Sequence, residues 1–162
     1  MDELGRLGNV LPAKNDLPLS ACGFDAFEIA VLEVARRFFI TFSRPESHGW
    51  VEAFETAERK LSPPFGATLA VAVMRAIQVL RGARSTTFNF IPPDCPICSR
   101  TITQEERYLI SILKAVRKRR RSEAMTHALL VCEGSDPEAL VIAFETLCVL
   151  IGEGPLADPS RP

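Results

Sequence analysis

Apolar residues recur every three or four positions along six segments of the chain, which is the spacing of one face of an α-helix. The clearest stripe predicts a helix over about 25–42 and consists of Phe27, Val31, Val34, Phe38 and Phe42. Comparable stripes predict helices over about 47–61, 65–80, 103–118, 122–134 and 137–151. No segment makes a convincing β-strand, so the pattern indicates an all-α protein.

Helix-start signals agree with these boundaries. Asp25 is a suitable N-cap for the first helix, because its carboxylate can accept hydrogen bonds from the unpaired N–H groups of the first turn. Thr103 and Glu106 have the Thr-x-x-Glu spacing of a capping box. Asp136 precedes Pro137, and proline is well tolerated at the first helical position.

The elements together predict a compact bundle of about six helices with an irregular, cysteine-containing turn in the middle. We expect residues 24–152 to form a single helical domain. Residues 1–23, rich in glycine, proline and asparagine, predict an extended or partly ordered N-terminal arm, and residues 153–162 predict a C-terminal tail.

Two helices carry more apolar residues than one buried stripe can use. Phe39 and Ile40 lie off the main stripe of the first helix, and Leu69–Met74 is apolar on every side of the third. A helix that is apolar all round is normally sandwiched between neighbours. The surplus predicts a homodimer that buries part of these residues.

Composition narrows the classes of partner. The 162 residues include 19 basic and 20 acidic side chains, a balance that argues against broad nucleic-acid binding. The N-terminus lacks the apolar core of a signal peptide, and the longest nearly uncharged stretch is too short and too broken to cross a bilayer. With an odd count of five cysteines, we expect a cytoplasmic protein whose thiols are mostly reduced, and no membrane partner.

The main chemical signal is Cys95-Pro96-Ile97-Cys98, which follows a proline-rich approach. Two thiolates at this spacing could share one zinc ion, which takes four ligands in structural sites. The candidates to complete the site are the same pair of a second subunit or residues of this chain, namely Cys22, His48, Cys148 and above all His127 and Cys132. A reversible disulfide and two inert thiols are the alternatives.

Six cations gather at the end of the predicted helix 103–118, namely Lys114, Arg117, Lys118, Arg119, Arg120 and Arg121. They could contact the phosphates of a nucleic acid or an acidic protein. Cations at a helix C-terminus also offset the negative end of the helix dipole, and that interpretation is favoured. His127 lies four residues after Glu123, which favours an exposed side-chain pair over a metal ligand.

No nucleophile–base pair or phosphate-binding glycine loop is present, so an enzyme is not favoured. The sequence predicts a regulatory or protein-interaction module, homodimeric and with a structural zinc clip at the cysteine pair. A nucleic-acid-associated regulator and a thiol-based redox sensor or oxidoreductase are the alternatives.

Overall fold

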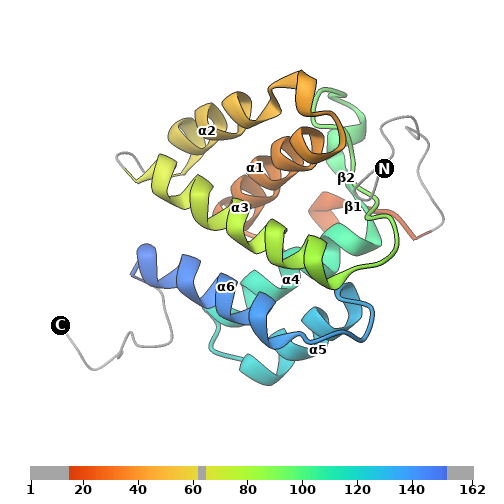
Figure 1. Cartoon of the computed structure of the whole chain (residues 1–162), viewed down its shortest axis with the longest axis vertical. Coiled ribbons are helices and arrows are strands. Elements are labelled where there is room, and N and C mark those ends of the chain that lie inside the picture. The colour runs from red at the N-terminus through yellow and green to blue at the C-terminus, as the bar shows by residue number, and fades with distance from the viewer. Residues whose placement is uncertain (1–14, 62–64, 153–162) are drawn as a thin grey trace.

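The computed structural model describes residues 15–61 and 65–152, and six α-helices make up most of this part of the chain (Figure 1). Their bounds are α1 Ala26–Ser43, α2 Gly49–Lys60, α3 Gly66–Ala83, α4 Gln104–Arg117, α5 Arg121–Val131 and α6 Glu138–Leu150. The predicted all-α bundle is confirmed, and each predicted helix overlaps an observed one. The predicted tail over 153–162 and residues 1–14 of the predicted arm lie outside the described residues.

The two predicted helix starts with the strongest signals are both capping boxes. The Asp25 carboxylate accepts a hydrogen bond from the N–H of Glu28 at 2.9 Å, and the Glu28 carboxylate accepts one from the N–H of Asp25 at 3.0 Å. Thr103 and Glu106 form the same reciprocal pair at the start of α4, with both distances 3.0 Å. Each box satisfies donors that a helix start would otherwise leave unpaired.

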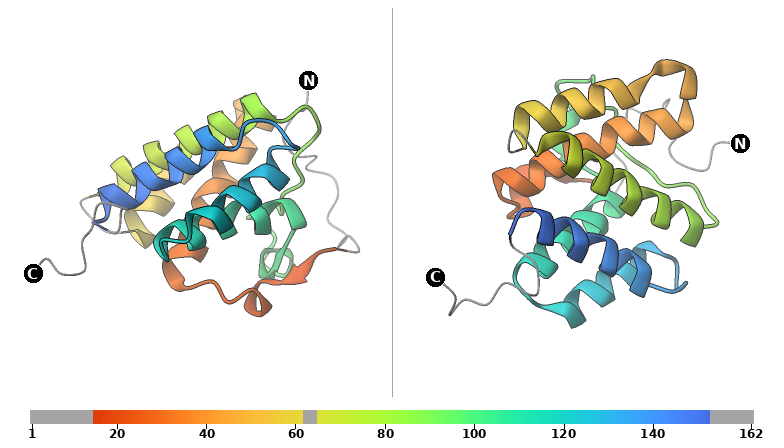
Figure 2. Two further views of the ribbon diagram at one scale, coloured as in Figure 1. Left: turned by 90° about the horizontal axis from the view of Figure 1, so that it is seen from below. Right: turned by 60° about the vertical axis from the view of Figure 1, so that its left-hand side comes forward.

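The helices form two halves that follow the order of the chain. In Figure 1, α1, α2 and α3 lie in the upper part of the molecule, and α4, α5 and α6 lie in the lower part. The halves meet where α3 packs against α6 and where α1 packs against α4. Figure 2 shows α3 and α6 side by side again, running in opposite directions. One continuous apolar core joins residues of all six helices.

The apolar surplus that predicted a dimer is largely buried within the chain. Phe39 is fully buried, and its ring centroid lies 4.7 Å from that of Phe88 and 5.3 Å from that of Phe90. Leu69 and Val73 are also buried in the core. The prediction that Phe39 contacts a second subunit is therefore wrong, because aromatic residues of the segment after α3 cover it. Leu69 and Val73 are likewise used within the chain, while Val71 and Met74 are only partly buried. The homodimer itself stays a prediction.

Residues 84–103, called here the connecting loop, run from α3 to α4 and carry the cysteine pair. The loop contains a short 3-10 helix, Cys98–Arg100, and strand β2, Thr101–Ile102. Strand β2 pairs antiparallel with β1, Leu17–Pro18, which leads into a second 3-10 helix at Leu19–Ala21. These two-residue strands are too short to produce an alternating pattern in the sequence. A third 3-10 helix, Pro45–Ser47, joins α1 to α2.

Helices α2 and α3 approach each other closely at Gly66. A Cβ atom added there would lie 2.6 Å from the Cα of Glu58 and 2.8 Å from the carbonyl oxygen of Ala57. Both contacts are with backbone, which cannot move away cheaply. Glycine at this position therefore allows the tight α2–α3 packing.

One helix of the described residues, α3, is long and apolar enough to cross a membrane. In the fold, 44% of that segment is buried. Core helices of soluble proteins meet the same criteria, so the observation does not decide where the protein resides.

Candidate functional site

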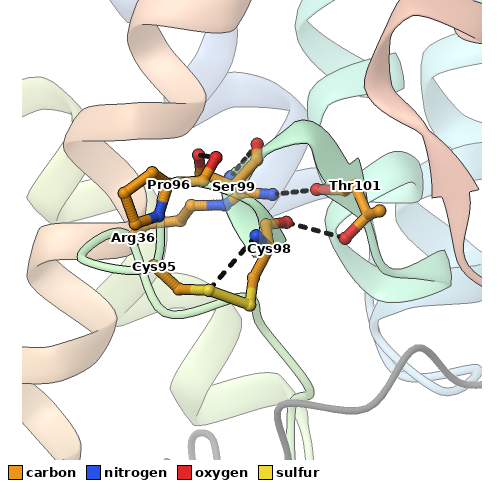
Figure 3. Close-up of a disulfide and its surroundings, with 6 residues drawn as sticks. All are labelled: Arg36, Cys95, Pro96, Cys98, Ser99 and Thr101. Carbon is orange, nitrogen blue, oxygen red and sulfur yellow. Dashed lines mark hydrogen bonds between the residues drawn. A yellow bond between two sulfur atoms is a disulfide. The ribbon is translucent and has the colours of Figure 1, made fainter.

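Cys95 and Cys98 are joined by a disulfide bond in an exposed turn, residues 95–98, called here the cysteine turn (Figure 3). Ile97, at its tip, is 81% exposed. The N–H of Cys98 points to the sulfur of Cys95 at 3.2 Å, and the Thr101 hydroxyl donates to the carbonyl oxygen of Cys98 at 2.7 Å. The turn is thus held by local hydrogen bonds, and its two cysteines are partly exposed.

Behind the cysteine turn, Arg36 of α1 forms a buried ion pair with Glu106 of α4. Two guanidinium nitrogens donate to the two carboxylate oxygens at 2.7 and 3.0 Å, and the side chains are only 2% and 0% exposed. The same guanidinium donates to the carbonyl oxygens of Ser99 at 3.1 Å and Thr101 at 2.7 Å. Figure 3 shows Arg36 reaching from α1 to these carbonyls.

Glu106 also holds the loop on its other side, because its carboxylate accepts the N–H of Ile91 at 3.3 Å. A buried charge pair is stable only when its remaining donors and acceptors are satisfied, as most are here. Arg36 and Glu106 therefore fix both ends of the segment that carries the cysteine turn. The helical pattern placed Arg36 away from the buried stripe of α1, and nothing in the local sequence indicates that the loop covers it.

The predicted zinc ligands do not come together within one chain. Among the described residues, no group of three or more His, Cys, Asp or Glu side chains could hold a metal ion. His127 pairs with Glu123, Nε2 to Oε1, at 3.9 Å, as the spacing favoured. Cys132 is buried near Arg84, and burial raises the pKa of its thiol to about 11. Zinc shared between the cysteine turns of two chains stays a prediction.

The predicted basic patch is mostly engaged within the chain. Arg117 pairs with Asp25 and Glu28, each at 2.6 Å, while Arg121 pairs with Glu138 at 2.7 Å. Lys114 donates to the carbonyl oxygen of Gly23 at 3.1 Å, and Arg120 lies 3.6 Å from Glu123. Lys118 and Arg119 are exposed. These ion pairs favour a structural role for the cations, which join the end of α4 and the start of α5 to neighbouring segments, over a nucleic-acid-binding surface.

A polar cavity of about 280 Å³, called here the turn cavity, lies between α1, α2 and the connecting loop. Pro93 and Ser99, which flank the cysteine turn, form part of its wall. Its charged lining comes from Glu33, Arg36, Arg37, Arg59 and Lys60. Leu19, from the 3-10 helix before α1, adds a fourth segment to the wall. Sequence reasoning missed this site, because its residues come from four segments with no common motif.

A larger and mainly apolar hollow of about 600 Å³, called here the α3–α6 groove, runs between those two helices. From α3 it is lined by Thr68, Val71, Ala72, Arg75 and Val79, and from α6 by Ala139, Ile142, Ala143, Thr146 and Leu150. Both sets follow the spacing i, i+3, i+4, i+7, i+11, so each helix presents one straight face to the groove. Ile142 is 48% exposed.

Comparisons with protein-family models, with curated proteins and with solved structures give no match, so the function has to be argued from this geometry alone.

Proposed function

We propose that this protein is a non-enzymatic protein-interaction module that binds an amphipathic helix of a partner protein in the α3–α6 groove. The observation that supports it is the groove itself, where two antiparallel helices expose matched apolar faces beside the core. Recognition of a helix by such a groove is a common mode of protein–protein binding, read through anchors at i, i+3, i+4 and i+7.

The dimensions of the groove suit a short helix. Each lining face extends over eleven helical steps, from Thr68 to Val79 and from Ala139 to Leu150. At a rise of 1.5 Å per residue this is about 17 Å, or three turns. A partner helix of about 12 residues would match that length, and one of about 16 residues would extend roughly one turn beyond it.

One charged residue in the groove indicates the chemistry of the partner. Arg75 lies midway along the α3 face, is exposed and forms no ion pair with any described residue. An acidic side chain near the middle of the bound helix would complement it. A second copy of this chain, placed about a two-fold axis at the groove's centre, would instead bring two Arg75 cations together.

Selection from a displayed library of 16-residue helical peptides tests this proposal. Wild-type protein should enrich peptides with apolar residues at i, i+3 or i+4 and i+7 and with Asp or Glu near the centre. The variant Ile142→Glu, which places a carboxylate in the groove, should lose binding of the enriched peptides. Val51→Glu is the matched control, because Val51 is an exposed residue of α2 outside the groove.

Enrichment of peptides that bind Ile142→Glu as well as wild type would contradict the proposal. Sedimentation velocity of wild type and Ile142→Glu tests the predicted homodimer at the same time. A dimer that dissociates in Ile142→Glu would show that a second copy occupies the groove, and the partner-helix proposal would then be replaced.

The disulfide favours a second function, reversible thiol–disulfide exchange at the cysteine turn. A glutathione thiolate attacks one sulfur of the Cys95–Cys98 bond, forms a mixed disulfide with it and releases the other cysteine as a thiolate. A second glutathione thiolate then attacks the glutathione sulfur of the mixed disulfide, so that the protein cysteine leaves as a thiolate and oxidised glutathione forms. Both protein thiolates can take up a proton from water, which leaves two protein thiols. The partial exposure of Cys95 and Cys98 supports this proposal, because the attacking thiolate has to reach a sulfur atom.

Equilibration in glutathione buffers, followed by alkylation and mass spectrometry, measures the exchange. A sensor should convert between dithiol and disulfide at roughly −220 to −320 mV, the range of the cytosolic glutathione pool. The thiol of Cys132 serves as an internal control, because its burial and raised pKa should keep it unlabelled in the folded protein. If Cys95 and Cys98 stay fully reduced or fully oxidised across this range, a redox sensor is excluded. Measurement of the zinc content of the reduced protein tests the predicted structural zinc site.

A further inference from the structure

The wall of the turn cavity includes a threonine whose hydroxyl group has no partner in the fold. Thr56, on the face of α2 turned toward α1, lines the cavity and is 4% exposed. Its hydroxyl makes no hydrogen bond with any described residue. A hydroxyl at a cavity wall that has no protein partner can donate a hydrogen bond to a ligand atom.

Two guanidinium groups in the same wall also have unused donors. Arg59 lies one helical turn after Thr56, also lines the cavity and forms no ion pair with any described residue. Arg36 uses four of its five N–H groups on Glu106, Ser99 and Thr101. The fifth, on Nη1, has no acceptor among the described residues.

The remaining charges of the wall are paired with each other or with residues around it. Lys60 lies 2.8 Å from Glu33, the one carboxylate in the described lining. Arg37 donates to Glu52 at 2.7 Å and to Asp94 at 2.6 Å. Cations therefore outnumber anions in the wall, and the unused groups there, a hydroxyl and guanidinium N–H groups, can all donate hydrogen bonds.

A purely structural role explains only part of this arrangement. Arg59 and Lys60 lie in the last turn of α2, where cations offset the helix dipole. That role needs no cavity, and it does not account for the unpartnered Thr56 hydroxyl or for the spare donor of the buried Arg36.

We propose that the turn cavity binds a small oxyanion, a phosphate or carboxylate group of a low-molecular-weight metabolite. Thr56 and Arg59 provide the main hydrogen bonds, and Arg36 adds its spare N–H. The volume of about 280 Å³ lies just below the roughly 300–1,000 Å³ of common ligand pockets, which favours a ligand smaller than a nucleotide.

Titration calorimetry with the oxidised full chain tests the site, using inorganic phosphate and malonate as separate probes and sodium chloride at equal ionic strength as the blank. Saturable binding of either probe is expected, and the tighter one identifies the anionic group of the ligand. Heat that does not saturate, or that chloride reproduces, would overturn the proposal.

Two variants locate the binding. Thr56→Val and Arg59→Gln should each weaken it about tenfold, the factor for losing a hydrogen bond to a charged group. The matched controls are Thr126→Val and Arg44→Gln, exposed residues that line neither the turn cavity nor the α3–α6 groove, and should leave affinity unchanged. If Thr56→Val fails to fold, the exposed Arg59 still provides the test. Unchanged affinity in Arg59→Gln would show that the anion binds elsewhere.

Discussion

The α3–α6 groove and the turn cavity are built on opposite principles. The groove arises from two regular helices, and its residues repeat with helical spacing along each of them. The cavity arises from α1, α2 and the connecting loop, and long-range hydrogen bonds to Arg36, Arg37, Glu105 and Glu106 hold that loop in place. The first surface needs two regular helices packed against each other, whereas the second also depends on polar contacts that hold an irregular loop.

This difference has consequences for stability. Apart from the buried Ala72, the groove residues are partly or largely exposed, so replacing one of them should leave the core intact. The loop contacts form one network around a buried charge pair, so removing a single member leaves other polar groups unpaired. We therefore expect substitutions of comparable size to cost more beside the cavity than in the groove.

The largest effect is expected at the buried ion pair. Arg36→Met leaves the Glu106 carboxylate buried without its partner and should lower the free energy of unfolding by about 3–5 kcal/mol. Chemical denaturation measures the loss. The control is Arg37→Met, whose more exposed ion pairs should contribute at most about 1 kcal/mol. Equal losses of unfolding free energy in the two variants would show that the buried ion pair of Arg36 contributes no more stability than the exposed pairs of Arg37.

Two residues of α6 should differ strongly in their contribution to stability, because one belongs to the core and the other lines the groove. Phe144 is 2% exposed, and Phe144→Ala should cost about 3–5 kcal/mol because it leaves a cavity in the core. Ile142 is two positions earlier and half-exposed, so Ile142→Ala should cost less than about 1 kcal/mol. Denaturation curves of both variants test this. A large loss for Ile142→Ala would mean that the groove face is part of the core.

The cap of α4 should give a moderate effect. The Thr103 hydroxyl accepts the N–H of Glu106 and donates to the carbonyl oxygen of Asn89 at 2.8 Å, so it joins the helix start to the connecting loop. Thr103→Ala should cost about 1–2 kcal/mol. Thr126→Ala, on the exposed side of α5, should be neutral within about 0.5 kcal/mol in the same thermal melts. If Thr103→Ala leaves the stability unchanged, the hydrogen bonds of the Thr103 hydroxyl do not stabilise the fold.

The smallest expected effect depends on pH. Hydrogen bonds from the hydroxyl and N–H of Thr86 lower the pKa of Glu133 to about 2 from its ordinary 4.5, and the N–H of Ser85 contributes. A lowered folded pKa adds stability above pH 4.5, which is lost as the pH falls toward 2. Glu133→Gln should melt below wild type at pH 7 and converge with it near pH 2. A difference in melting temperature between the two proteins that does not change with pH would contradict the lowered pKa of Glu133.

The helices were predictable because each carries its own signal. The stripe from Phe27 to Phe42 and the capping boxes at Asp25 and Thr103 lie within a few residues of what they specify. The boundaries of α1 differ from the prediction by only one residue at each end. The cysteine pair was also recognisable, although the sequence left open whether it holds metal, forms a disulfide or is inert.

The turn cavity and its network could not be predicted from the sequence. Arg36 and Glu106 are 70 residues apart, and neither has a neighbour that indicates burial of its charge. Phe39 was assigned to a dimer surface because the loop residues that cover it, Phe88 and Phe90, follow no helical period. Such contacts arise from the tertiary path of the connecting loop, which local patterns do not specify.

A charge-swap cycle in the α3–α6 groove tests the proposed function most directly. A selected peptide with Glu at its centre should bind wild type, bind Arg75→Glu at least tenfold more weakly by titration calorimetry, and recover on that variant when its Glu is replaced by Lys. Equal affinity of the Glu peptide for wild type and Arg75→Glu would contradict helix recognition in the α3–α6 groove.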